Sequence, residues 1–162
     1  MRGYARLLDA LGVAAGTAFA LIALATTWDV GVRSLAGGTV KGLAEWVEYV
    51  LFVSTFLAAP WLLRHNGHVQ VDFLVEALPE RLRAATRRAG DAVGLAVCAV
   101  LLVYAVRVTL GAWQSGSLVM KTMIFPEWWL YAVIVVSMAL LVLEFARRLV
   151  VGQVEPHGPQ DL

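Results

Sequence analysis

Four long uncharged stretches, separated by clusters of charge, dominate the pattern of hydrophobic and polar positions along the chain. They extend over residues 10–28, 49–63, 92–106 and 128–143. A helix needs about 20 mostly apolar residues to cross a bilayer, and long charged side chains at the ends of a shorter run can reach the headgroups. The pattern therefore predicts an all-α integral membrane protein with four transmembrane helices, at approximately residues 10–28, 45–63, 90–113 and 126–146.

The composition supports this class and excludes several others. The 162-residue chain is 60% hydrophobic and 15% charged, with a mean hydropathy of +0.74, whereas globular proteins are roughly 45–50% apolar and about 25% charged. So many apolar residues exclude a disordered chain, and a net charge of +1 gives no basic footprint for nucleic acid. A single cysteine excludes a disulfide framework within the chain. The expected surroundings are the lipid bilayer.

Tryptophans mark the ends of the predicted spans. All six lie near a span end, and none lies at a span centre. Because the indole ring prefers the headgroup layer, we interpret them as interfacial anchors; the alternative is that they fill gaps between packed helices. These residues are Trp28, Trp46, Trp61, Trp113, Trp128 and Trp129.

Basic residues flank the spans asymmetrically. Of the 13 lysines and arginines, nine lie in the N-terminal, central and C-terminal segments, three lie in the other two loops, and Arg107 lies within the third span. The positive-inside rule therefore predicts that both termini are cytoplasmic, with a flexible C-terminal tail over residues 152–162. An alternative for the first span is a cleaved secretory signal, because Ala23-Leu24-Ala25 resembles a cleavage site. A span is favoured because the apolar run is long and reaches Trp28.

The connection between the second and third spans has its own periodicity. Residues 68–88 carry one apolar and one polar stripe at helical spacing, which predicts an amphipathic segment on the cytoplasmic face of the membrane. Pro79 cannot continue a helix, so one helix should end near Leu78 and another should begin at Pro79 and run into the third span. Residues 68–73 also alternate as a strand would, but a lone strand leaves its backbone groups unpaired, which favours a helix.

The sequence offers little catalytic chemistry. All three histidines lie outside the predicted spans, so the chain cannot supply an intramembrane histidine pair for haem. His65, His68 and Asp72 could be assembled into a metal site, but two or three ligands in a polar segment give little support for one. No nucleophile with its base and no phosphate-binding glycine loop is present. We expect no enzyme activity, no metal and no cofactor.

Three ionisable residues lie in the half of the spans near the outer loops. Glu45 and Glu48 are at the start of the second span, and Arg107 is near the end of the third. They could form a coupling-ion or proton site, or Arg107 could pair with one of the two carboxylates and hold two spans in register. We favour the pair, because no second acid lies deeper in the predicted spans; which glutamate it involves stays open.

Two further groups of residues suggest packing roles. Glu144 lies one helical turn from Arg147 and Arg148, so we interpret these three as a cytoplasmic anchoring cluster. Small residues of the first span could admit close helix packing, within the chain or against a partner, or could be ordinary lipid-facing sequence. They are Gly12, Ala15, Gly16 and Ala20.

Two motifs give the chain a family resemblance. Arg64-His65-Asn66-Gly67-His68-Val69-Gln70-Val71-Asp72, followed by Leu78-Pro79, comes after the second span. Phe125-Pro126-Glu127-Trp128-Trp129-Leu130-Tyr131 opens the fourth. In this order, on a chain with four spans, they resemble the small permease subunit of the tripartite ATP-independent periplasmic (TRAP) transporters. By position, Glu45 matches the family's glutamate at the mouth of span two, and His68, Asp72 and Pro79 match its cytoplasmic motif.

The resemblance implies a non-catalytic scaffold in the bacterial inner membrane. It implies a stable complex with a large permease subunit, transient docking of a periplasmic substrate-binding protein, and organic acid uptake driven by an ion gradient, usually sodium. Many members carry a second proline further into span four, whereas Val133 to Val136 continues unbroken here. The alternatives are a membrane anchor or assembly factor of another complex, and a small self-sufficient proton-coupled transporter.

Overall fold

The computed structural model describes residues 2–38, 42–65, 80–120 and 124–151. These residues form four long helices and one short hairpin. In chain order the elements are α1 (Arg2–Ala36), α2 (Leu43–Arg64), α4 (Glu80–Ser115), β1 (Leu118–Met120), β2 (Ile124–Pro126) and α5 (Trp128–Val151). Each helix contains a stretch that is long and apolar enough to cross a membrane: Arg6–Leu35, Leu43–Arg64, Ala85–Ser115 and Trp128–Val150. The predicted helical membrane fold with four spans is confirmed.

The first helix extends beyond the predicted span 10–28 at both ends. Beyond Trp28 the helix continues through Asp29 and Arg33, whose side chains pair one turn apart at 3.0 Å. Such pairs stabilise an exposed helical turn, so charge ends the apolar run without ending the helix. α1 stops at Ala36 because Gly37 adopts a left-handed φ of 66°, the usual conformation at a helix C-terminus.

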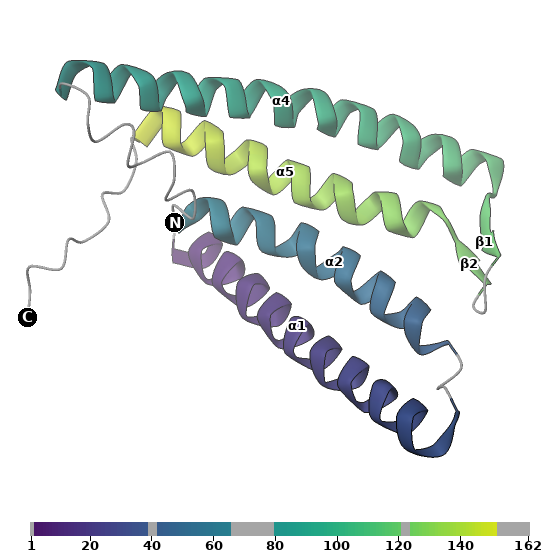
Figure 1. Cartoon of the computed structure of the whole chain (residues 1–162). Helices are drawn as coiled ribbons and strands as arrows, with labels where there is room; N and C mark the ends of the chain where they lie inside the picture. Colours follow the sequence, from purple (N-terminus) through teal and green to yellow (C-terminus); the bar gives the residue numbers. More distant parts are fainter. Residues whose placement is uncertain (1, 39–41, 66–79, 121–123, 152–162) are drawn as a thin grey trace, which may run out of the picture.

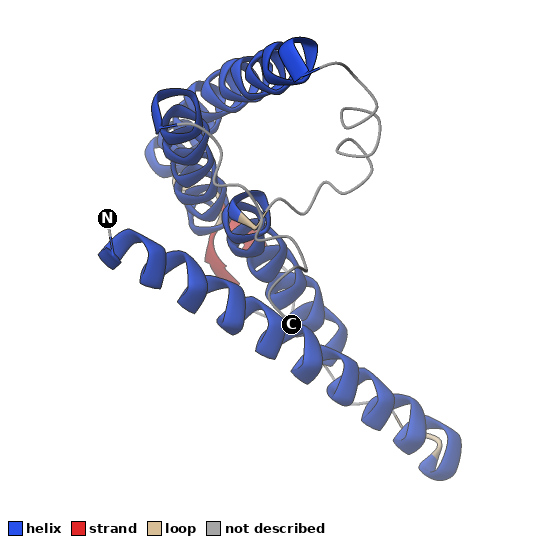
Figure 2. Cartoon of the chain, turned by 90° about the vertical axis from the view of Figure 1, so that its left-hand side faces the viewer, coloured by secondary structure: helices blue, strands red, loops and turns tan. Residues whose placement is uncertain are grey.

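The four helices lie side by side in an open fan. Their order across the molecule is α4, α5, α2 and α1, with α5 packed between α4 and α2, and α2 packed between α5 and α1 (Figure 1). The perpendicular view in Figure 2 shows α1 inclined at the outside of this group. The beginnings of α1 and α4 and the ends of α2 and α5 lie toward one end of the molecule, which we call the charged end; the opposite end, with β1 and β2, is the hairpin end.

The segment before the third span is helical as far as the structure describes it. α4 begins at Glu80 and continues without a break to Ser115, so the helix predicted to start near Pro79 does run directly into the third span. Residues 68–79 of the predicted interfacial segment, which include His68, Asp72 and Pro79, lie outside the described residues. The predicted C-terminal tail, residues 152–162, also lies outside them.

A short hairpin replaces the predicted start of the fourth helix. Pro126 was expected to open that helix, but it lies in β2 opposite Leu118 of β1, and α5 begins at Trp128. The hairpin is entered through Gly116 at a φ of 63°, and the Glu127 N–H donates to the Ser117 carbonyl at 3.0 Å. Strands of three residues are too short to show an alternating pattern in the sequence, which explains the error.

The helices contact one another along narrow stripes. Apolar side chains that are buried include Leu8, Ala15, Leu63, Ala112 and Leu141, whereas large apolar side chains are exposed along all four helices. The most apolar stretch of α4 contains no buried residue. Because the helices form an open layer, most of their apolar surface remains available to lipid or to another protein.

Glycine permits the closest helix contacts. The Trp61 ring of α2 lies over Gly12 of α1, where an added Cβ would be less than 3.0 Å from the ring. In the same way, Phe145 of α5 lies over Gly94 of α4, where a Cβ would be 2.6 Å from the ring. The hypothesis of close packing at small residues therefore holds for Gly12. At Gly16, one turn further along the same face, an added Cβ would have no neighbour within 4 Å, so the close contact does not extend to Gly16.

Candidate functional site

The residues predicted to form an intramembrane ion pair do not come together. Glu45 and Glu48 lie in the first turns of α2, and Arg107 is exposed on α4. Within the described residues no ion pair links Arg107 to either glutamate. The physical reason is the order of the helices: α4 packs against α5, whereas α2 packs against α5 and α1 (Figure 1). The predicted pairing is therefore corrected.

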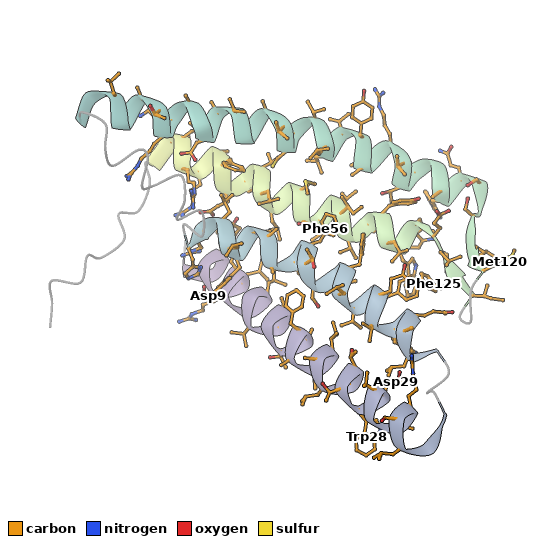
Figure 3. All side chains as sticks on the ribbon, viewed as in Figure 1. Asp9, Trp28, Asp29, Phe56, Met120 and Phe125 are labelled. Atoms are coloured by element: carbon orange, nitrogen blue, oxygen red, sulfur yellow. The ribbon has the colours of Figure 1, made fainter. Side chains whose placement is uncertain are left out.

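Most of the tryptophans are exposed near the helix ends. Trp28, Trp46, Trp113 and Trp129 keep more than half of their surface exposed, and Figure 3 shows Trp28 on the outer side of α1, away from α2. Trp128 is half-buried beside Trp129. Trp61 differs from the others because its ring packs on Gly12. For Trp61 the packing alternative describes the contact that is observed, and the anchoring role of the others remains a prediction.

The charged end holds a cluster of acidic and basic side chains around the buried Glu144. The Glu144 side chain has no exposed surface, and its carboxylate accepts hydrogen bonds from Arg147 Nη2 at 2.7 Å and Arg147 Nε at 3.3 Å. The Arg148 Nε lies 3.9 Å from the same carboxylate. A buried carboxylate requires such partners because an unpaired charge is costly to remove from water. These three residues do form a cluster, in which Glu144 is buried; the anchoring role expected for them at the cytoplasmic face remains a prediction.

Arg148 extends the cluster to two other helices. Its Nη1 lies 4.0 Å from the buried carboxylate of Asp91 on α4, and its Nη2 donates to the carbonyl of Leu63 in the last turn of α2. The last carbonyls of a helix have no partner within the helix, so the guanidinium satisfies one of them. One side chain of α5 therefore contacts both neighbouring helices of the fan.

Tyr4 brings α1 to the same place. Its hydroxyl donates to the Leu140 carbonyl of α5 at 3.4 Å. Burial, followed by the negative charge of Glu144, raises the pKa of the Tyr4 hydroxyl above its ordinary value. The hydroxyl therefore stays protonated and able to donate throughout the physiological pH range. Side chains or backbone groups of all four helices thus meet at the charged end.

Sequence reasoning missed two members of this cluster, Asp91 and Tyr4. A usable signal was present for Asp91, because it lies inside the predicted third span, 90–113, where an acid needs a cationic partner. The signal for Tyr4 was weaker, because nothing local indicates that α1 begins next to the end of α5. Both residues become members of the cluster through contacts between different helices.

A cavity opens beside the cluster. It has a volume of about 400 Å³ and is lined by Tyr4, Arg64, Leu143 and Arg147. Arg64, selected from the sequence as part of a motif, is the last residue of α2, so the structure brings it to the same end as Glu144. The Nε2 of His65, the next residue, lies 3.8 Å from the Oδ1 of Asp9 on α1. No group of three or more potential metal ligands occurs in the described part of the chain.

A second polar contact joins the centres of α2 and α5. Pro60 has no N–H, so the carbonyl of Phe56 lacks its usual helical donor. The Ser137 hydroxyl of α5, which is fully buried, donates to that carbonyl at 2.5 Å. Figure 3 shows Phe56 where α2 and α5 run side by side. In membranes a proline inside a helix is tolerated when a neighbouring hydroxyl supplies the missing donor, and Ser137 does this here.

Replacing Ser137 with alanine is expected to lower the free energy of unfolding by about 1 kcal/mol, because interhelical hydrogen bonds in membrane proteins are worth roughly 0.6–2 kcal/mol. In a Pro60→Ala background the loss should be smaller, since the substituted alanine has an N–H that can donate to the Phe56 carbonyl. Equilibrium unfolding of the four variants of this double-mutant cycle in mixed micelles measures the coupling. Equal losses in both backgrounds would show that the Ser137 bond is not tied to Pro60.

Comparisons with known proteins are consistent with these features. The family model described as "Tripartite ATP-independent periplasmic transporters, DctQ component" matches residues 22–153, which is most of the chain. This range includes α2, α4, α5 and the hairpin in full, and the second half of α1. No curated protein matches the chain.

Proposed function

The chain belongs to the DctQ family of tripartite ATP-independent periplasmic (TRAP) transporters, and from this premise we propose that it is a non-catalytic scaffold for the large permease subunit. As the small membrane component of such a transporter, it is a multi-pass membrane protein with helices that can span the bilayer. We place it in the bacterial inner membrane with both termini in the cytoplasm, so that the charged end faces the cytoplasm. Uptake would use an ion gradient, with organic acids as the substrates and sodium as the coupling ion.

The open arrangement of the helices is the observation that carries this proposal. A protein that transports alone needs polar groups along a path through its own interior. In the described part of the chain the buried polar or charged residues are Ser54, Asp91, Ser137 and Glu144. Asp91 and Glu144 lie near arginines at the charged end, and the Ser137 hydroxyl donates a hydrogen bond to the backbone carbonyl of Phe56. Long exposed apolar faces, in contrast, suit a component that packs against a larger membrane protein.

The hairpin end is the surface we assign to the substrate-binding protein. In the proposed orientation it faces the periplasm, as do the end of α1 and the beginning of α2. Met120 of β1 is 80% exposed and lies at the outer side of the hairpin, whereas Phe125 of β2 packs edge-on against Tyr49 of α2 (Figure 3). One side of the hairpin is thus held to the helices while the other is available for a partner.

The position of Arg107 suggests that α4 forms part of the interface with the large subunit. It lies eight residues before the end of the span Ala85–Ser115, which corresponds to about 12 Å along a helix. An ionisable side chain at such a depth is costly unless it finds a partner or reaches the headgroups. Because Arg107 is exposed and has no ion pair within the described residues, we propose that an acidic group of the large subunit pairs with it.

Replacing Arg107 with leucine is expected to lower the affinity for the large subunit about thirtyfold, because removing one member of a buried interfacial charge pair costs about 2 kcal/mol or more. Transport per assembled complex should be unchanged. Co-purification with the tagged large subunit, followed by uptake assays in proteoliposomes, separates the two quantities. Arg88→Leu, on the same helix but exposed at the charged end, is the matched control. A variant that assembles normally but loses ion coupling would instead support the coupling-ion hypothesis.

Reconstitution tests the proposed function as a whole. The chain, the large permease subunit and the binding protein should together support uptake of an organic acid under a sodium gradient, and omission of the chain should abolish it. Liposomes that contain the chain alone should show no uptake. Uptake by the chain alone would establish a self-sufficient transporter. Failure to form a complex with the large subunit would favour an anchor or assembly factor of another complex.

A further inference from the structure

The cavity at the charged end has the walls of an anion site. Arg64 at the end of α2 and Arg147 on α5 line it together with Tyr4 of α1 and the apolar Leu143. Arg147 uses its Nε and Nη2 for Glu144, and a guanidinium has five N–H donors. Its Nη1 donors therefore remain for another acceptor. The single hydroxyl hydrogen of Tyr4 is donated to the Leu140 carbonyl, so the donors that remain for a ligand are those of the two arginines.

The charges around the cavity leave one cation in excess. Glu144 is paired with Arg147 and lies near Arg148, and Arg148 also lies near Asp91. These two acids and two arginines balance one another. Arg64 adds a further positive charge, and among the described residues it forms no ion pair or side-chain hydrogen bond. The cavity thus favours a ligand with one negative charge.

The cavity also lies at the depth of lipid headgroups. Arg64 is the last residue of one span, Arg147 lies near the end of another, and Tyr4 precedes the first. Leu143, one turn further into the bilayer from Arg147, is 57% exposed. A ligand in the cavity would therefore place its charged group between the arginines and an apolar part against Leu143. Basic pockets between transmembrane helices are known to take anionic lipid headgroups.

We propose that this cavity binds the phosphate group of an anionic phospholipid. Arg64 and Arg147 provide charge-assisted donors to the phosphate oxygens, and an acyl chain lies along Leu143. A bound lipid would contact α1, α2 and α5 at once and so hold the charged end together. The site does not depend on the transporter role, because every residue that forms it belongs to this chain.

Native mass spectrometry of the full chain in detergent tests the site directly. Phosphatidylglycerol should form a one-to-one complex with the chain. Phosphatidylcholine, which has no net charge, should form less of this complex. Arg64→Gln should weaken this binding about fivefold, as expected for one arginine at a membrane surface. Arg88→Gln, an exposed cation at the same end, should change it by less than about twofold. Circular dichroism should show unchanged helicity in both variants.

Three results would overturn the proposal. Equal losses in Arg64→Gln and Arg88→Gln would show general attraction to a basic surface. Stabilisation of the chain by inorganic phosphate, without binding of phosphatidylglycerol, would identify a site for a soluble anion. Loss of assembly with the large permease subunit in Arg64→Gln, with lipid binding unchanged, would identify the cavity as a contact for an acidic segment of that subunit. Loss of uptake with lipid binding unchanged would concern the proposed function and would not contradict the lipid site.

Discussion

Replacing Arg148 with leucine is expected to lower the free energy of unfolding of the chain by about 3–5 kcal/mol, the usual cost of breaking a buried ion pair from one side. The substitution would leave Asp91 without the guanidinium that lies 4.0 Å away. It would also remove the donor to the Leu63 carbonyl and one of the two cations next to Glu144. Each of these groups is buried, so water cannot readily replace the lost partner.

Equilibrium unfolding in mixed micelles, followed by circular dichroism, measures this loss. Arg88→Leu removes the same charge from an exposed position on α4 at the same end, and it should change the free energy of unfolding by less than about 0.5 kcal/mol. An ion pair between buried side chains offsets their desolvation without necessarily adding net stability. The large loss expected for Arg148→Leu therefore arises because the acidic partners stay buried after the cation is removed. Equal effects of the two substitutions would contradict the buried cluster.

Replacing Gly12 with alanine is the second substitution with a large expected effect, a loss of about 1–3 kcal/mol from overpacking. The added Cβ would clash with the Trp61 ring at the ring atom nearest the backbone. That atom stays in place when the ring rotates about χ2, so relief requires a change of the Trp61 χ1 rotamer or a separation of α1 and α2. The Phe145 ring over Gly94 is approached at its far edge, where a small rotation relieves the contact, so Gly94→Ala should cost less.

Gly16→Ala is the matched control for the second substitution. It makes the same chemical change one turn further along α1, where nothing lies within 4 Å of the new Cβ, and it should leave stability unchanged or slightly higher because alanine favours the helix. Equilibrium unfolding in mixed micelles measures the effect. A loss at Gly16 as large as that at Gly12 would show that the Trp61 contact does not set the cost.

The helices were predictable because each signal was local. A long apolar run needs no tertiary information to be identified as a span, and the helix that follows Pro79 was expected to run into the third span, as α4 does from Glu80 onwards. The hairpin was not predictable, because its strands are three residues each. The helix after Trp28 was not predicted either, because charges that end a span need not end a helix.

The candidate site was only partly predictable for a different reason. The proximity of Glu144, Arg147 and Arg148 follows from their spacing along one helix. Burial of that cluster, and the arrival of Asp91 and Tyr4, depend on which helices are neighbours. The predicted pair between Arg107 and a glutamate of α2 was wrong for the same reason, because α5 lies between α4 and α2.

The sequence by itself determined the environment, the number of spans and the family resemblance, since apolar length, charge position and short motifs are properties of consecutive residues. The tertiary structure decided the order of the helices and therefore which charges meet. Contacts between residues far apart in the chain depend on how whole helical faces pack. Examples are the Trp61 ring over Gly12 and the hydrogen bond from Ser137 to the Phe56 carbonyl, which lacks a helical donor because of Pro60. For that physical reason the buried charge cluster and its cavity became visible only when all four helices were in place.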